Sequence, residues 1–369
     1  MNISPIRAEG KLPDVKFLIK DIGKKIKNND FMHASNRINQ FFHINNFKED
    51  LFCNIEYPYV DSHYRDSFYF YHSSKNYHVE KDCIRISFFD TPFNLDNPFS
   101  DLINGLSTFL GILVIRPTRN NQFGRMILSP NAFTIPPIEI ICRKYYFTVR
   151  GIKLNVEAFQ NSGQDNELHT CSETSLLSVL NYFSKYDHFK DKTPSKIFSV
   201  IDSLRYENIE PGKGMKQNEI SFVLKEFGFG VRSYSRTNNN AEGFKKAFND
   251  YIESGLPVIT VFSQIDEKSK KVDSSRLENV ESLSNGIAHS VIYIGYMNSQ
   301  IDDFKIKANS VSFNKFNGTT ILDYINSLTS NRKYVFIDDN QAPYRIGGFY
   351  NPLNSFDKKN ILFLVLLSP

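Results

Sequence analysis

Residues 164–186 constrain the fold of this chain more than any other stretch of its sequence. From Ser175 onward, apolar residues fall at positions 176, 177, 179, 180 and 183, which is the spacing of an amphipathic helix with one buried face. A polar run rich in Ser and Thr precedes them, as is typical of a helix N-terminus. The pattern predicts a buried helix with Cys171 at or just inside its first turn.

A cysteine at that position is open to two interpretations. Free backbone N–H groups and the positive end of the helix dipole both stabilise a thiolate, so Cys171 can serve as a nucleophile. A lone cysteine at a helix start is, however, more often an ordinary small apolar residue. A catalytic role for Cys171 therefore requires partner residues elsewhere in the chain.

Length and charge narrow the class of protein. A chain of 369 residues is long enough for two domains, and its formal charge of +4 is small for that length. No segment concentrates Lys and Arg with interleaved aromatic residues, so nucleic-acid binding is not predicted. The first residues lack the apolar core of a signal peptide, and no stretch approaches the roughly 18 apolar residues of a membrane span, so no membrane association is predicted.

The cysteines and histidines outside the stretch around Cys171 favour structural roles. No two of the cysteines lie at Cys-x-x-Cys spacing, which favours a reducing cytoplasm; they are Cys53, Cys83, Cys142 and Cys171. Cys142 lies in an apolar strand-like segment and is predicted to be a core residue. His63, His72 and His78 share no helix face and no carboxylate pattern accompanies them, so no metal site is predicted, and no cofactor.

The chain is predicted to divide near residue 150. Residues 1–150 are expected to form a mixed α/β domain of unknown role, through which a partner protein could bind. In this part, helices are predicted at 15–26, 31–47 and 99–109, and strands at 52–59, 68–71, 84–89, 111–117, 124–130 and 138–149.

Residues 151–369 show helices first and strands after. Helices are predicted at 175–183, 195–204, 217–227, 241–254 and near 319–327, an exposed loop at 264–286, and strands at 154–159, 231–234, 256–262, 287–296, 334–339 and 361–367. This order predicts an α+β fold with a mainly antiparallel sheet.

Residues with the properties of partners for Cys171 lie in that second part. A cysteine nucleophile needs a base to accept its proton and a third group to orient the base. His289 begins an apolar strand, and Asp338 and Asp339 end another, where a carboxylate can meet a histidine on the adjacent strand. Gln164 precedes Cys171 by seven residues, close enough to donate to an oxyanion beside the backbone N–H of Cys171.

Each of these residues also has an ordinary interpretation. A lone buried histidine is more often simply hydrogen-bonded in a core, an Asp-Asp-Asn run is more often a turn, and a lone glutamine is a loop residue. Their joint occurrence in this order favours a catalytic site. Strand alternation sends Asp338 and Asp339 to opposite faces, so only one is expected to face His289, and Asp338 is preferred. His169 is a rival base, two residues from Cys171.

The order of these segments resembles a known family. The segments are Gln164-Asp165-x5-Cys171 before an apolar helix, Gly255-Leu-Pro-Val-Ile, Ala288-His289-Ser-Val-Ile-Tyr-Ile-Gly295-Tyr, and Ile337-Asp338-Asp339-Asn-Gln-Ala-Pro343-Tyr344. Together they resemble papain-fold cysteine peptidases of the bacteriocin-processing type, which cleave double-glycine leaders, and their stand-alone bacterial relatives. The resemblance covers about residues 154–369.

The resemblance implies a papain-like domain at 151–369 with a Cys171-His289-Asp338 triad, Gln164 as oxyanion donor and Asp339 as the alternative third member. It implies a hydrolase that cleaves an amide or isopeptide bond of a peptide or protein substrate through an acyl-enzyme. The chain departs from the usual pattern of that family at two points. Ser172 stands where Gly or Ala is common, and Asp338 follows His289 by 49 positions. A non-catalytic papain-fold module that binds a peptide or partner, and a transglutaminase-like acyl transferase, remain the alternatives.

Overall fold

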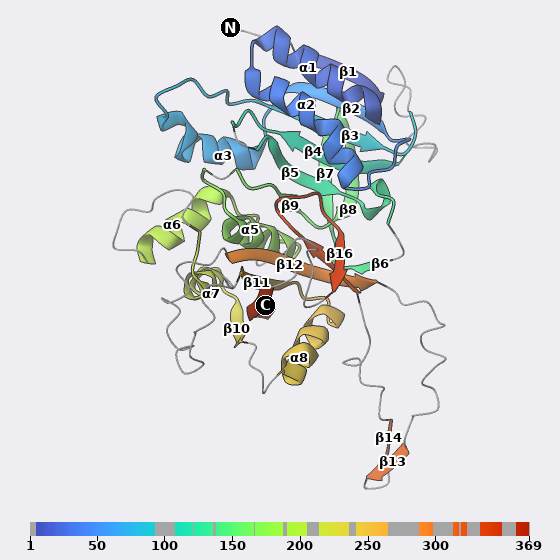
Figure 1. Cartoon of the computed structure of the whole chain (residues 1–369), viewed down its shortest axis with the longest axis vertical. Coiled ribbons are helices and arrows are strands. Elements are labelled where there is room, and N and C mark those ends of the chain that lie inside the picture. Colours follow the sequence, from blue (N-terminus) through green and yellow to red (C-terminus); the bar gives the residue numbers. More distant parts are fainter. Residues whose placement is uncertain are drawn as a thin grey trace.

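The computed structural model describes residues 5–92, 108–119, 121–135, 138–165, 167–186, 190–204, 214–235, 241–264, 288–297, 313–316, 319–322, 333–348 and 359–368. Figure 1 shows two sheets with helices on their faces. Every strand pairing among these residues is antiparallel. The predicted α+β class is therefore confirmed. No helix in the described part of the chain is long and apolar enough to cross a membrane.

The first sheet is built mainly from the N-terminal part. Its strand order is β1-β2-β3-β4-β5-β9, with β1 (Ile6–Lys11), β2 (Phe52–Tyr59), β3 (Cys83–Phe89), β4 (Phe109–Ile115), β5 (Phe123–Leu128) and β9 (Asn161–Ser162). Helices α1 (Val15–Ile26) and α2 (Asn29–Ile44) cover one face, because each presents an apolar stripe that joins the core. The hairpin of β7 (Arg143–Val149) and β8 (Ile152–Ala158) packs on the other face.

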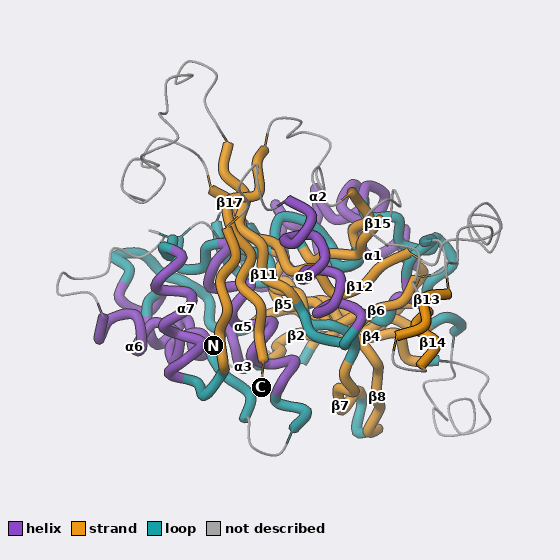
Figure 2. Tube along the Cα trace, turned by 90° about the horizontal axis from the view of Figure 1, so that it is seen from below, coloured by secondary structure: helices purple, strands orange, loops and turns teal. Residues whose placement is uncertain are grey.

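The second sheet carries the C-terminal part. Its order is β10-β17-β11-β12-β15-β16, with β6 paired to β12; the strands are β6 (Ile138–Ile140), β10 (Gly230–Ser235), β11 (Val258–Gln264), β12 (Ala288–Met297), β15 (Lys333–Ile337), β16 (Arg345–Gly348) and β17 (Lys359–Ser368). Figure 2 shows β17, β11 and β12 side by side. Helices α5 (Cys171–Phe183), α6 (Pro194–Leu204) and α7 (Gln217–Glu226) lie on one side, and α8 (Ala241–Glu253) lies on the other.

Alternation along β12 explains why both faces of this sheet are covered. Ile292 and Ile294 join the core that includes α5, whereas Val291 and Tyr293 join a separate core under α8. Because successive strand residues point to opposite faces, a strand that is apolar throughout requires cover on both.

The main chain passes between the two sheets on either side of residue 150. β6 precedes that position and pairs with β12 of the second sheet, whereas β9 follows it and pairs with β5 of the first. One apolar core joins residues of α2, α5 and β12. The domain boundary near 150 stays a prediction.

Helix α5 lies between the two sheets, and this changes one expectation about it. Every residue from Ser172 to Phe183 is buried, so the prediction of a single buried face was wrong. The apolar spacing correctly located the helix, but its polar positions also lie inside the protein, because β12 and the turn after β15 cover two of them.

The strand predicted at 68–71 was also wrong, since Ser62–Phe70 form helix α3. Asp61 begins this helix by accepting the Tyr64 N–H on Oδ1 at 2.9 Å. Tyr69 and Phe70 remain exposed, at 64% and 49%. The aromatic run resembled a strand because it is continuous, but its other two members, Phe68 and Tyr71, are only half-buried.

Other differences lie in the less regular parts. The predicted strand 138–149 is divided at Ile141 and Cys142 into β6 and β7, and Cys142 is half-buried. Residues 319–322, predicted as helix, form β14 (Thr319–Leu322) and pair with β13 (Phe313–Phe316). Parts of three predictions lie outside the described residues. They are residues 323–327 of this helix, residues 99–107 of the helix predicted at 99–109, and residues 265–286 of the predicted loop. Short 3₁₀ turns occupy Leu12–Asp14, His72–Ser74 and Pro130–Ala132.

Candidate active site

Helix α5 begins at Cys171, as predicted. Thr170 precedes it with extended backbone angles (φ −108°, ψ 176°), and its hydroxyl donates to the Glu173 carboxylate. The Cys171 side chain therefore lies in the first turn, where backbone N–H groups have no partner within the helix. Cys171 is half-buried.

The loop before Cys171 is held by one buried carboxylate. Asp165 Oδ1 accepts the backbone N–H groups of Glu167, Leu168 and His169 at 3.0, 2.8 and 2.8 Å. Burial by itself raises the pKa of Asp165, but the nearby histidines, Arg116 and these N–H groups lower it well below its usual range. Asp165 is therefore an anion that fixes the loop leading to Cys171.

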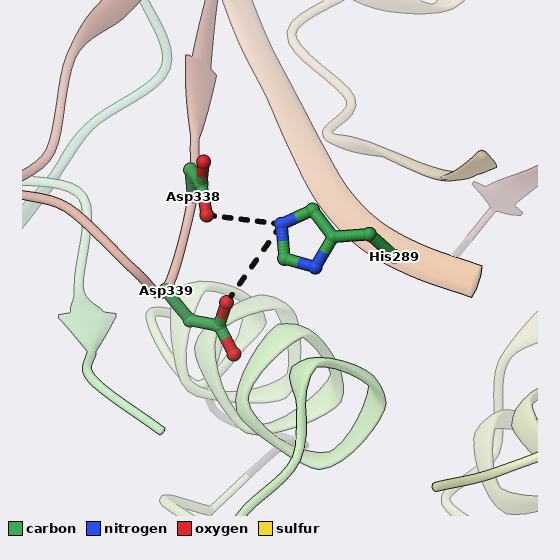
Figure 3. A group of neighbouring side chains, drawn as sticks. All are labelled: His289, Asp338 and Asp339. Carbon is green, nitrogen blue, oxygen red and sulfur yellow. Dashed lines mark hydrogen bonds and ion pairs between the residues drawn. The ribbon is translucent and has the colours of Figure 1, made fainter. Parts of the chain in front are cut away.

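The second element of the site is His289, the second residue of β12. Its Nε2 lies 3.0 Å from Asp338 Oδ1, and Figure 3 shows the two side chains pointing toward one another. Asp338 follows the last residue of β15, a strand that pairs with β12. The Asn340 N–H also donates to Asp338 Oδ1, at 3.0 Å. The apolar patterns of the two strands thus account for the meeting of His289 and Asp338.

His289 also hydrogen-bonds the Cys171 side chain. Burial lowers the pKa of His289, but the hydrogen bonds to Asp338 and Cys171 and the charges of these groups outweigh burial and raise the pKa to about 10. The structure therefore favours an imidazolium between a carboxylate and a sulfur.

Both aspartates face His289, so the prediction that only one does so was wrong. Asp339 Oδ1 lies 3.9 Å from His289 Nε2, and Thr174 Oγ1 donates to Asp339 Oδ2 at 2.9 Å. Strand pairing ends at Ile337, and the alternation of side chains ends with it. Burial and the charge of Asp338 raise the pKa of Asp339 to about 7, although His289 opposes them. The pKa of Asp338 is lowered instead: burial raises it, but the hydrogen bond and charge of His289 dominate.

Gln164 lies against the turn that carries the aspartates. Its side-chain Nε2 donates to Asn340 Oδ1, and its backbone N–H donates to the Asp339 carbonyl at 3.3 Å. Asn121 Nδ2 donates to the Gln164 carbonyl at 2.8 Å. These bonds fix Gln164 next to the aspartates. Its role as an oxyanion donor stays a prediction.

The rival base, His169, has a different partner. Its Nε2 lies 2.9 Å from Ser67 Oγ of α3. Burial lowers the pKa of His169 to about 4, against the charge of Asp165 and with Arg116 and His72 adding to the effect. His169 is therefore neutral at physiological pH and connects α5 to α3.

Sequence reasoning missed the polar residues inside α5. Thr174 bonds Asp339, and Ser175 Oγ accepts from Ser290 Oγ at 3.1 Å, next to His289. The sequence did contain a signal for them, because Thr174 and Ser175 are polar residues in a helix that is otherwise rich in apolar ones. Ser172, where Gly or Ala is common in the resembled family, accepts the Met215 N–H on its Oγ at 3.4 Å.

Three ligand-type side chains converge in the site. One atom each of His289, Asp338 and Asp339 lies within 4.8 Å of the others, close enough to share a metal ion. Asp339 alone of the three lines a cavity of about 350 Å³, together with Asn340, Gln341 and residues of α2 and of 121–126. A second cavity, of about 710 Å³, lies beside α3 and contains none of the predicted site residues.

No protein-family model matches this chain, and no curated protein matches it in sequence. The resemblance to papain-fold peptidases therefore depends on the quoted segments and on the geometry described here.

Proposed function

We propose that this chain is a cysteine peptidase-like hydrolase with a papain-like arrangement in residues 151–369. The observation that carries the proposal is the position of His289, whose Nε2 is hydrogen-bonded to Asp338 and whose ring also interacts with the Cys171 side chain. Thiol acyl-transfer chemistry needs this linear order of nucleophile, base and orienting carboxylate.

In the proposed reaction, the Cys171 thiolate attacks the carbonyl carbon of an amide. The backbone N–H of Cys171 and the second N–H of the Gln164 amide stabilise the oxyanion, while Asn340 holds the first N–H. His289 Nδ1 gives its proton to the leaving amine, and an acyl-enzyme remains. A water molecule then attacks, and His289 accepts its proton as the acid is released.

Two alternatives predict different behaviour from the same geometry. An acyl transferase would release the acyl-enzyme to an amine instead of water, so added primary amines would be incorporated into the product. A non-catalytic module would bind a peptide or partner at these residues without any turnover. The buried pair of His289 and Asp338 favours catalysis over simple binding, since a binding cleft has no need of a buried charged pair.

Brief labelling with iodoacetamide at pH 6, followed by peptide mapping, tests the proposal. We expect Cys171 to be alkylated ahead of the other three cysteines. Burial raises the pKa of each of those thiols, to about 12 for Cys142. His169→Asn should leave the labelling rate unchanged, whereas His289→Asn should lower it. Equal labelling of all four cysteines, or sparing of Cys171, would overturn the catalytic proposal.

A further inference from the structure

We propose that His289, Asp338 and Asp339 bind a divalent zinc ion and that this ion inhibits the thiol reaction. Figure 3 shows the three side chains pointing toward one another from the start of β12 and the end of β15. The binding itself depends only on these three residues. The inhibitory effect rests on the function proposed above.

A Cys-His-Asp triad needs only one carboxylate, so Asp339 has no role in it. Asp339 is 5% exposed, and its Oδ1 accepts no hydrogen bond from another described residue. This atom faces His289 Nε2 at 3.9 Å. A buried carboxylate oxygen without a hydrogen bond is costly. A cation between Asp339 and His289 would remove that cost.

The distances suit a small tetrahedral ion. Zinc binds imidazole nitrogen and carboxylate oxygen at about 2.1 Å, so ligand atoms around it lie about 3.4 Å apart. The distances from His289 Nε2 to Asp338 Oδ1 and to Asp339 Oδ1 are 3.0 and 3.9 Å. Both ligand distances can reach 3.4 Å through side-chain shifts of a few tenths of an ångström.

The chemistry of the ligands and their supports agrees with this ion. One imidazole with two carboxylates suits zinc, whereas magnesium and calcium prefer oxygen ligands alone. Two carboxylate charges also balance a divalent cation. Thr174 holds Asp339 Oδ2 and the Asn340 N–H holds Asp338 Oδ1, as outer hydrogen bonds do in metal sites. Asp339 also lines the cavity of about 350 Å³.

Binding would remove the acid that the proposed reaction needs. The zinc ion displaces the proton of His289 Nε2 into solvent and takes its place. The ring then keeps one proton, on Nδ1. Transfer of that proton to a leaving amine would leave an imidazolate on the zinc, whereas the same transfer in the metal-free enzyme leaves a neutral imidazole. The amine is therefore a poor acceptor for the Nδ1 proton when zinc is bound.

Calorimetric titration of the full-length Cys171→Ala variant with zinc chloride tests the site without the sulfur. We expect one ion per chain. Asp339→Asn in the same background should weaken binding at least tenfold, and so should Asp338→Asn. The matched control is His72→Gln, which removes a different buried histidine beside two carboxylates, Asp165 and Glu167, and should leave affinity unchanged. Cobalt, as a spectroscopic substitute, should show tetrahedral visible bands without a sulfur charge-transfer band.

The outcomes separate the two proposals. Loss of binding in Cys171→Ala would place the ion on the sulfur and overturn this inference, as would unchanged affinity in folded Asp339→Asn and Asp338→Asn. If zinc binds with these ligands but Cys171 is unreactive in the metal-free protein, the site stands and the proposed function fails. If Cys171 is reactive and zinc leaves its alkylation and turnover unchanged, the inhibitory part is wrong.

Discussion

The surroundings of His289 and His169 differ in charge, although both histidines are buried and near an aspartate. His289 is bonded to Asp338 and Cys171, with Asp339 nearby, and its pKa is raised to about 10. His169 lies near Asp165, but that carboxylate is bound by three backbone N–H groups, and Arg116 and His72 add positive charge. The pKa of His169 falls to about 4. The comparison teaches that burial alone makes a histidine neutral, and that only a carboxylate directed at the ring makes it an acid.

The largest expected effect separates the two histidines by activity. Cys171→Ala should abolish turnover without unfolding, because alanine is well tolerated in a helix. His289→Asn should lower turnover about a thousandfold, within the range for removal of a general acid–base. His169→Asn, the matched control, should retain activity. A comparable loss in both histidine variants would contradict the assignment of His289 as the sole base.

The two regions should also respond differently to acid. The folded-state pKa of His169 lies below its unfolded value of about 6.5, so its contribution to stability is complete above that pH and is lost as the pH falls toward 4. This group alone can cost up to about 3 kcal/mol. His289 has the opposite sign, since its stabilisation is lost only as the pH rises toward 10.

Urea unfolding of His169→Gln between pH 7 and 4 measures this effect. The variant should lose less unfolding free energy with acidification than the wild type does. His33→Gln, on the exposed face of α2, should behave as the wild type. If the unfolding free energy falls equally steeply with decreasing pH in all three proteins, then His169 does not limit stability in acid. The other buried histidine with a lowered pKa, His63, would then be the next one to replace.

Replacement of Gln164 tests the region around His289 further. If its amide donates to the oxyanion, Gln164→Ala should lower turnover about a hundredfold while leaving the melting temperature nearly unchanged. Gln40→Ala, which removes an exposed amide on α2 beside the cavity that Asp339 lines, is the control. A large fall in melting temperature would instead mean that the bond from Gln164 to Asn340 holds the loop, and that the oxyanion donors lie elsewhere.

The smallest effect concerns Thr174. Thr174→Val removes the hydroxyl that bonds Asp339 and should cost about 1–2 kcal/mol of unfolding free energy, because a buried carboxylate loses a donor. Ser178→Ala removes a hydroxyl that bonds only within α5, to the Thr174 carbonyl, and should cost less. Chemical denaturation of both variants decides this. Equal costs would mean that the contact with Asp339 contributes nothing specific.

The sequence alone located the elements that carry the site, but it did not fix where each of them begins and ends. The apolar spacing located α5 with Cys171 in its first turn, and the apolar runs located β12 and β15, so that His289 and Asp338 meet across paired strands. These features are local, because a helix or strand period reports directly which residues of one segment are buried.

The tertiary structure decided what covers each segment and where each side chain points. Periodicity cannot reveal which distant segments bury the polar side of α5, nor that the aromatic run at 68–71 closes a helix begun at Asp61. Asp339 turned toward His289 because pairing stops at Ile337, and His169 became neutral because burial and the charge of Arg116 outweigh the nearby carboxylates. Each of these outcomes depends on contacts between segments far apart in the chain, which no local pattern encodes.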